Sequence, residues 1–208
     1  PYGKPRFKDF ILENILSLNA DYSFSVDQKY FDSFAGEVII NKAFEELFNR
    51  PKRSPKEPID QFYMDVAASA QKATEEAIIH LAKGIRLEGY SENLCLAGGV
   101  ALNCVANARI RRECGFSDVW VQPAAGDAGG ALGAAMYTLH NEFGVERSET
   151  NVDRMHGAYL GPILVAEQVK EQLDKDGASF DIFDEDELIE RAAQALASGK
   201  TLAWHQGR

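Results

Sequence analysis

Two successive units in the middle of the chain, each an apolar run, a glycine-rich loop and a helical pattern, constrain the fold more than any other feature. The first has apolar residues at 94–97, then Gly98-Gly99, then a helical pattern from about residue 101. The second has apolar residues at 119–121, the loop 122–127, and a helix with apolar residues at 128, 132, 135, 139 and 143. Such units predict an α/β domain with both loops at one edge of a sheet. Because ligands bind beyond the carboxyl ends of the strands in such sheets, the two loops are the predicted ligand site.

A long helix is predicted over about residues 59–83 and beyond, before the first unit. Its apolar residues recur at steps of three or four, which places them on one helical face. This predicted buried stripe consists of Phe62, Val66, Ala70, Ala73, Ala77 and Leu81. The opposite face is expected to be solvated and carries Gln61, Gln71, Lys72, Glu75 and Lys83.

The N-terminal part of the chain predicts shorter elements. We expect a helix near 8–17, strand-like pieces around 22–31 and a helix near 41–49. A loop at 50–58 then holds three of the seven prolines and four basic residues, Arg50, Lys52, Arg53 and Lys56. These basic side chains either help to bind an anionic ligand or form an ordinary solvated loop, and the sequence leaves both open.

The pattern changes after residue 144, where the chain becomes polar and loses its periodicity. We therefore place a domain boundary near 150–158, with one domain over 1–155 and the start of a second over 156–208. The second is expected to form a helix, a short strand and another helix within 165–200, followed by a strand at 201–204. Its excess of acidic residues is typical of a solvated helical face.

Composition excludes several classes of partner. The formal net charge is −10, and basic residues do not cluster as a nucleic-acid surface requires, so no nucleic acid is expected. No run approaches the roughly 18 apolar residues that span a bilayer, so no membrane is expected. The cysteines match no zinc spacing and predict buried free thiols in a reducing cytoplasm; they are Cys95, Cys104 and Cys114.

The first glycine-rich loop suits a phosphate. Gly98 and Gly99 follow a buried strand, let the backbone turn tightly and leave no Cβ between backbone and ligand. The helix that follows would direct unpaired N–H groups at the same space, which favours an anion. Asn103, in the first helical turn, could add a side-chain donor. The alternative is that the glycines only form a tight strand-to-helix turn.

The second loop suits a cation beside that phosphate. Asp127 stands next to Gly126 where the apolar helix begins, and its hard carboxylate could hold a divalent ion. Asp is also a favoured N-cap residue, so an ordinary helix cap is the alternative. A cap does not require Gly129, Gly130 and Gly133, each of which lowers helix propensity by about 1 kcal/mol. They predict that a neighbouring helix or a ligand approaches this backbone closely.

These motifs resemble the NodU/CmcH-type O-carbamoyltransferases. The resemblance rests on Leu-Cys-Leu-Ala-Gly-Gly-Val-Ala-Leu-Asn at 94–103 and Gln-Pro-Ala-Ala-Gly-Asp-Ala-Gly-Gly-Ala-Leu-Gly-Ala-Ala at 122–135. It extends to the preceding helix, with Asp65-Val66-Ala67-Ala68-Ser69-Ala70-Gln71 and Thr74-Glu75. It also extends to Trp204-His205-Gln206-Gly207-Arg208, which is similar to the start of the family's C-terminal signature. The resemblance thus covers nearly the whole chain, with two long motifs in the family's order.

The resemblance implies an actin-like ATPase (ribonuclease H-like) lobe over 1–155. It implies that 156–208 begin a domain similar to threonylcarbamoyl-AMP synthases, which makes carbamoyl-adenylate from carbamoyl phosphate and ATP. The carbamoyl group would then pass to a hydroxyl of a small-molecule or sugar acceptor in biosynthesis. Carried over residue by residue, it implies that Asp127 is a metal ligand, with iron as the expected ion. It also implies that the nucleotide phosphates face Gly98, Gly99, Asn103 and Gly126.

The chain lacks one part of the family pattern. The family's metal site also needs a histidine pair from the first lobe, whereas the histidines here are isolated and are expected to be surface or structural residues: His80, His140, His156 and His205. The first lobe, the other metal ligands and the acceptor-activating groups are expected before Pro1, and both chain ends are expected to be truncations. We therefore expect the 208 residues alone not to transfer carbamoyl groups.

Two other interpretations stay open. A sugar-kinase-like or other ATPase lobe of the same fold superfamily also uses Gly-Gly loops for phosphates, but it has no need for a carboxylate such as Asp127 at the start of the helix. A non-catalytic binding or assembly module would bind neither nucleotide nor metal. The sequence predicts neither the acceptor nor the oligomeric state.

Overall fold

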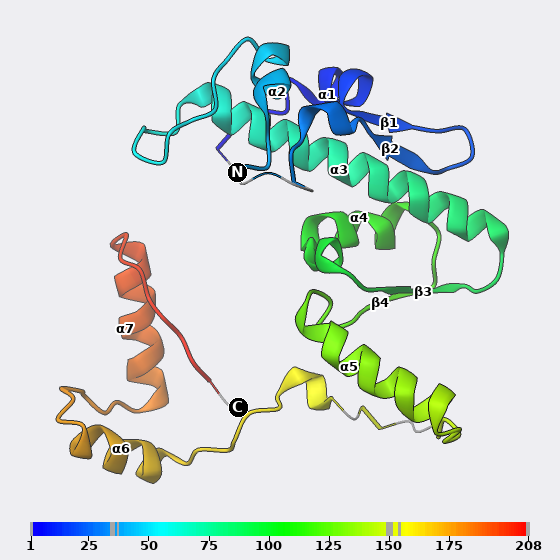
Figure 1. Cartoon of the computed structure of the whole chain (residues 1–208). Helices are drawn as coiled ribbons and strands as arrows, with labels where there is room; N and C mark the ends of the chain where they lie inside the picture. The colour runs from blue at the N-terminus through cyan, green and yellow to red at the C-terminus, as the bar shows by residue number, and fades with distance from the viewer. Residues whose placement is uncertain (1, 34–35, 37, 149–151, 154, 207–208) are drawn as a thin grey trace. The chain divides into compact units, whose positions relative to one another are not determined.

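The computed structural model describes residues 2–33, 36, 38–148, 152–153 and 155–206. The chain divides into two units, 1–145 and 146–208. The first is mixed α/β, as the sequence predicts (Figure 1). The predicted boundary near 150–158 includes residues outside the described ones, and the assignment of the two domains stays a prediction.

The helix α3 (Gln61–Glu88) is the centre of the first unit and confirms the predicted long helix. It begins at Asp60, whose side chain accepts a hydrogen bond from the Tyr63 N–H at 3.2 Å. It ends at Gly89, whose φ of 73° is the left-handed conformation that commonly closes a helix.

The burial of α3 differs from the single predicted stripe. Ala73 and Ala77 are buried as expected, but Ala70 and Leu81 are exposed. Glu75, expected on the solvated face, is buried. The reason is that α3 contributes to two separate cores, so elements cover it on more than one side and a single apolar face cannot describe it.

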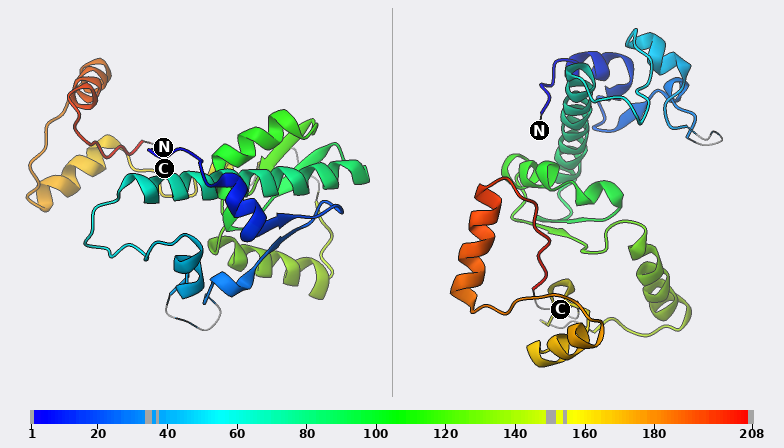
Figure 2. Two further views of the ribbon diagram at one scale, coloured as in Figure 1. Left: turned by 90° about the horizontal axis from the view of Figure 1, so that it is seen from above. Right: turned by 90° about the vertical axis from the view of Figure 1, so that its left-hand side faces the viewer.

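The N-terminal elements pack along one side of α3 (Figures 1 and 2). They are α1 (Lys8–Asn14), β1 (Leu16–Leu18), β2 (Phe24–Val26), η1 (Gln28–Tyr30) and α2 (Lys42–Leu47). The helix expected near 8–17 is shorter than predicted because β1 pairs with β2 in an antiparallel hairpin. Ile11, Ile15 and Tyr30 form the buried core of this layer with Ala73 of α3.

The other side of α3 packs against a strand–helix–strand unit, which positions the predicted site. It consists of β3 (Asn93–Leu96), η2 (Gly99–Leu102), α4 (Cys104–Glu113) and β4 (Asp118–Val121). The two strands are parallel and in register from Asn93↔Asp118 to Leu96↔Val121. Their core joins α3, α4 and β3 through Ile79, Ala82, Leu94, Ile110, Cys114 and Phe116.

The helix α5 (Ala128–Tyr137) follows β4 and continues into a π-helical turn, η3 (Thr138–Glu142). The predicted helix therefore forms. However, its apolar stripe is exposed, and no residue of α5 is buried. The glycine-rich sequence forms the helix, but no described element of the first unit covers its apolar side chains.

The second unit contains η4 (His156–Ala158), α6 (Ala166–Lys175) and α7 (Glu185–Ala197). The two expected strands, one between the helices and one at 201–204, are wrong: the described residues of this unit form no strand. A strand needs a neighbour for its backbone hydrogen bonds, and these residues offer none. Gly207 and Arg208, part of the quoted C-terminal run, lie outside the described residues.

The prediction of three buried thiols is wrong for two of them. Cys114 is buried, whereas Cys95 and Cys104 are exposed. Cys95 alternates with buried Leu94 along β3 and so faces the other side of the sheet. Cys104 opens α4 about half a turn from buried Ala106, on the opposite helical face.

Within the described residues, no helix is long and apolar enough to cross a bilayer.

Candidate functional site

The two glycine-rich loops lie side by side at the carboxyl ends of β3 and β4. Parallel pairing in register brings the ends of both strands to the same edge, where the Gln122 N–H donates to the Leu96 carbonyl at 3.1 Å. Beyond the strands, the Gly98 N–H donates to the Ala125 carbonyl at 2.8 Å. A Cβ on Gly126 would lie 4.0 Å from the Gly99 Cα. The structure thus brings together three of the residues predicted to contact phosphate.

The first loop exposes its backbone. Gly98 has φ 95° and ψ 159°, a conformation essentially restricted to glycine. A Cβ on Gly98 or on Gly99 would meet nothing within 4 Å, so the space beside both is open. The N–H groups of Gly99 and Val100, in the first turn of η2, donate to no group in the described part of the chain. This turn can therefore present two backbone donors to an anion.

Asn103 occupies a different position from the one predicted. The helix expected from about residue 101 starts as the 3-10 turn η2, and Asn103, with φ −75° and ψ 86°, is the N-cap of α4. Its Oδ1 accepts the Ala106 N–H at 3.2 Å. The side chain of Asn107 also donates to the Ala101 carbonyl at 2.7 Å, which fastens η2 to α4. Asn103 is thus part of the support of the loop.

Asp127 sits at the N-terminal end of α5 but does not cap it. Its carboxylate is exposed, accepts no capping hydrogen bond, and has no hydrogen-bond or ion-pair partner among the described residues. Only its backbone carbonyl acts locally, accepting the Gly130 N–H at 3.1 Å. The carboxylate oxygens are therefore available to a ligand from outside the described residues.

The glycines around Asp127 have separate explanations. A Cβ on Gly129 would lie 2.1 Å from the Ala124 carbonyl oxygen, so at this glycine the preceding loop makes the close approach, and not the predicted neighbouring helix or ligand. Gly130 and Gly133 have open space where a Cβ would be. For these two, no described residue supplies the predicted close neighbour.

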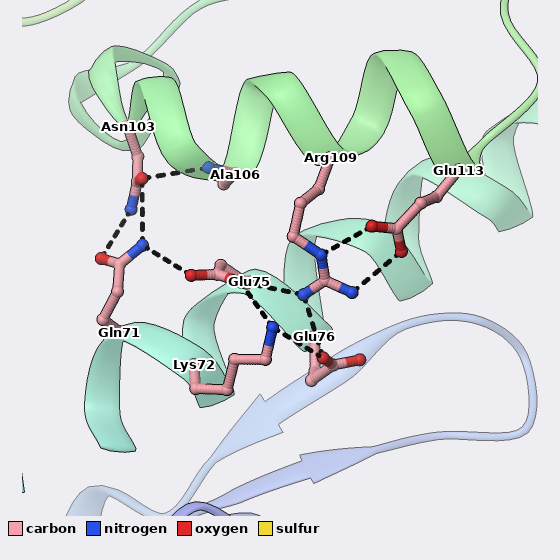
Figure 3. A network of polar contacts seen from close by, with 8 residues as sticks. All are labelled: Gln71, Lys72, Glu75, Glu76, Asn103, Ala106, Arg109 and Glu113. Carbon is pink, nitrogen blue, oxygen red and sulfur yellow. Dashed lines mark hydrogen bonds and ion pairs between the residues drawn. The ribbon is translucent and has the colours of Figure 1, made fainter. Parts of the chain in front are cut away.

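A polar network around the buried Glu75 lies behind the first loop and was missed by sequence reasoning. It joins α3 to α4 through Gln71, Lys72, Glu75, Glu76, Asn103, Arg109 and Glu113 (Figure 3). The Glu75 carboxylate accepts bonds from Lys72 at 3.0 Å and from Arg109 at 2.9 Å. One signal was present: Arg109 and Glu113 stand four residues apart, the spacing of a helical ion pair.

The charges of this network are mutually stabilised. Burial alone would raise the pKa of the Glu75 carboxyl, but hydrogen bonds from Lys72, Gln71 and Arg109 outweigh burial, and the pKa lies below its ordinary value. The pKa of Arg109 is raised, first by its hydrogen bonds to Glu113 and then by those to Glu75 and Glu76. Glu75 is therefore ionised at neutral pH despite its burial.

The described residues supply one candidate metal ligand and no complete metal site. No group of three or more His, Cys, Asp or Glu that could hold a metal ion occurs among them, so Asp127 would need further ligands from elsewhere. Two histidines have structural partners: His80 bonds to the Asn19 carbonyl at 2.7 Å, and His140 to the Val145 carbonyl at 2.6 Å. A divalent ion fits Asp127 chemically, as a hard oxygen ligand.

The basic loop at 50–58 lines a cavity to which the two glycine-rich loops do not contribute. Arg50 forms an ion pair with Asp60 and lies 5.1 Å from the centre of the Phe62 ring. Arg50, Lys52 and Arg53 line a largely apolar cavity of about 710 Å³ with residues of α2 and α3. None of the lining residues belongs to the two glycine-rich loops.

Comparisons with known proteins cover both loops. The family model for the carbamoyltransferase N-terminus matches residues 1–136. The uncharacterized protein sll1178 of Synechocystis sp. is 45% identical over 210 residues, which cover 100% of this chain and 34% of that protein. Nodulation protein NolO of Bradyrhizobium diazoefficiens is 39% identical over 152 residues, 73% of this chain and 27% of the relative. Nodulation protein U of the same organism is 39% identical over 139 residues, which cover 65% of this chain and 22% of that protein. The chain thus spans about a third or less of the length of these curated relatives.

Proposed function

The chain belongs to the carbamoyltransferase family, and we propose that it supplies the phosphate-binding and metal-binding loops of such an enzyme, within an actin-like ATPase lobe. One observation carries the proposal. Two adjacent loops are joined by the hydrogen bond from the Gly98 N–H to the Ala125 carbonyl. One has an open backbone at Gly98 and Gly99, and at the end of the other is Asp127, whose carboxylate makes no capping hydrogen bond. An anion and a cation can therefore bind next to each other.

The proposed reaction moves a carbamoyl group to a hydroxyl. In the C-terminal domain, of which residues 156–208 would be the start, water cleaves carbamoyl phosphate to carbamate and phosphate. The carbamate oxygen then attacks the α-phosphorus of ATP, which forms carbamoyl-adenylate and releases pyrophosphate. In the transferase domain the acceptor oxygen then attacks the carbamoyl carbon and loses its proton, a new C–O bond forms, and the bond to the adenylate phosphate breaks to release AMP. The acceptor is a small molecule or sugar, and the cytoplasm is the expected location.

The residues of this chain would bind and orient the leaving phosphate. The backbone N–H groups of Gly99 and Val100 donate to its oxygens, while Gly98 and Gly126 keep the backbone accessible. Asp127 would be one ligand of a divalent ion, with iron as the proposed metal. When bound, this ion would stabilise negative charge on the phosphate as a Lewis acid.

The full-length enzyme with Asp127→Ala tests the proposal. We expect carbamoyl transfer to be abolished while carbamoyl-adenylate formation stays largely intact, because that step belongs to another domain. Asp118→Ala, an exposed carboxylate on the strand that leads into the same loop, is the matched control and should transfer normally. A wild-type transfer rate in Asp127→Ala would remove this residue from the mechanism.

A second measurement concerns the 208-residue chain itself. We expect the purified chain to form no carbamoylated product from carbamoyl phosphate, ATP and an acceptor, because Asp127 alone cannot complete a metal site. Product formation would contradict this.

A further inference from the structure

A reciprocal pair of amide hydrogen bonds links the middle of α3 to the end of the first loop. The Asn103 Nδ2 donates to the Gln71 Oε1 at 3.0 Å, and the Gln71 Nε2 donates to the Asn103 Oδ1 at 3.1 Å (Figure 3). The two residues are 32 positions apart in the sequence. Gln71 therefore contacts directly the residue at which the Gly98–Gly99 turn passes into α4.

Glu75 determines which way the Gln71 amide points. The Gln71 Nε2 also donates to the Glu75 Oε1 at 3.1 Å, while the Glu75 Oε2 accepts from Lys72 and Arg109. An ionised carboxylate can only accept hydrogen bonds, so the NH2 group of Gln71 must face it. The opposite orientation of the amide would place two acceptor oxygens against each other. A buried charge, rather than the amide pair itself, thus fixes the orientation of Gln71.

The orientation of Gln71 in turn fixes that of Asn103. The Asn103 Oδ1 already accepts two hydrogen bonds, from Gln71 and from the Ala106 N–H. The Asn103 Nδ2 gives one of its two hydrogens to Gln71, and the other has no partner in the described part of the chain. The hydrogen-bonding capacity that remains on Asn103 is therefore a donor, which suits a phosphate oxygen; a free acceptor would repel it.

We propose that Gln71 is a positioning residue of the phosphate loop and that Glu75 acts through it, so that Asn103 offers its remaining N–H to the bound phosphate. This inference rests on the proposed function, in which the Gly98–Gly99 turn binds the phosphate of an adenylate. Gln71 and Glu75 need not touch the ligand. Their effect passes from the buried carboxylate through one amide to the next.

The test uses AMP titrated by calorimetry into the full-length enzyme. Gly98→Val first identifies the binding event that belongs to the loop, because a branched side chain cannot adopt the backbone conformation of Gly98 without strain. If Gly98→Val removes no AMP binding event, the proposed function fails. The positioning role is then judged only on the binding event that Gly98→Val removes.

Gln71→Leu and Glu75→Gln are the informative variants. Leucine removes both bonds to Asn103, and we expect the Kd for AMP to rise about five- to tenfold, the range for one hydrogen bond. In Glu75→Gln, Lys72 and Arg109 hold the new amide oxygen, so its NH2 turns toward Gln71. The Gln71 amide must then rotate by half a turn. Asn103 consequently loses either its two hydrogen bonds with Gln71 or the hydrogen bond that it accepts from the Ala106 N–H. We expect the Kd to rise by about threefold or more.

Glu76→Gln is the matched control for loss of stability. Glu76 accepts from Arg109 at 3.0 Å in the same network but makes no hydrogen bond to Gln71 or Asn103. It should leave the Kd within about twofold, and the melting temperatures of both variants show how much stability each has lost. Wild-type AMP affinity in Glu75→Gln, or an equal loss in Glu76→Gln, would overturn the positioning role while leaving the loop assignment intact. If Gln71→Leu does not fold, Glu75→Gln decides the question alone.

Discussion

The two strand–loop–helix units have similar sequence patterns, but the helix of the first is partly buried and the helix of the second is not. In the first, α4 is rich in polar residues, yet Ala106 and Ile110 are completely buried. In the second, α5 is almost entirely apolar, glycine or alanine, yet none of its residues is buried. The connection explains the difference: α4 returns the chain from β3 to β4 and must lie over that sheet, whereas α5 leaves the last strand. Burial here follows topology rather than apolar content.

The largest expected contrast is in the free energy of unfolding. Ile110→Ala in α4 should cost about 2–4 kcal/mol because it leaves a cavity in a closed core. Leu132→Ala in α5, where leucine is 39% exposed, should cost no more than about 0.5 kcal/mol. Urea unfolding of the 208-residue chain measures both. Equal losses would show that α5 is packed as firmly as α4.

Gly98 in the first loop and Gly130 in α5 should respond in opposite directions to substitution by alanine. Gly98→Ala forces a side chain into a conformation that only glycine adopts readily and should destabilise by about 1–3 kcal/mol. Gly130→Ala adds a methyl group to open space within a helix and should stabilise by about 0.5–1 kcal/mol. The same unfolding measurement applies. Destabilisation by Gly130→Ala would mean that some element does approach α5 there.

Hydrogen exchange compares the helices without mutation. The amides of α4 should exchange roughly tenfold more slowly than those of α5, or slower still, because local opening of α4 breaks core contacts and that of α5 breaks none. Mass spectrometry of peptides from both helices gives the rates. Similar protection in the two would contradict the packing difference.

The smallest effect is a pH dependence specific to the first unit. The pKa of the Glu75 carboxyl is lowered in the folded chain: burial opposes this, but hydrogen bonds from Lys72, Gln71 and Arg109 outweigh it. Its stabilising contribution is therefore complete above about pH 4.3, the ordinary value for Glu, and is lost as the pH falls through the lowered pKa. Glu75→Gln should lose less stability on acidification than the wild type, measured by thermal melting. Parallel curves would exclude Glu75 as a source of acid sensitivity.

The sequence predicted well what depends on local pattern. The long helix, the two strands and the two loops occur where periodicity and glycines placed them, and parallel pairing puts the loops at one edge. It could not predict which face of α3 is buried, because that depends on elements on more than one side of the helix. Expecting Glu75 in solvent was wrong for this reason: Arg109, 34 residues away, covers it.

The adjacency of the two glycine-rich loops was predictable from the sequence, but the local contacts of Asn103 were not. Two glycines directly after a strand favoured an open backbone over a plain tight turn only weakly, and the structure shows open space beside both Gly98 and Gly99. The role of Asn103 depends on where the 3-10 turn ends and on its contact with Gln71, neither of which a pattern encodes. The strands expected after residue 158 failed because a strand requires a partner, which the described part of that unit does not contain.

The bond from the Gly98 N–H to the Ala125 carbonyl uses no side chain. Substitutions elsewhere in either loop can change the side chains around this hydrogen bond without removing it. Only proline at position 98 would remove the N–H donor. This bond therefore links the Gly98–Gly99 turn directly to the loop that leads into Asp127. Under the proposed function, a ligand that displaces one turn would also displace the other, so the anion and the cation would not bind independently.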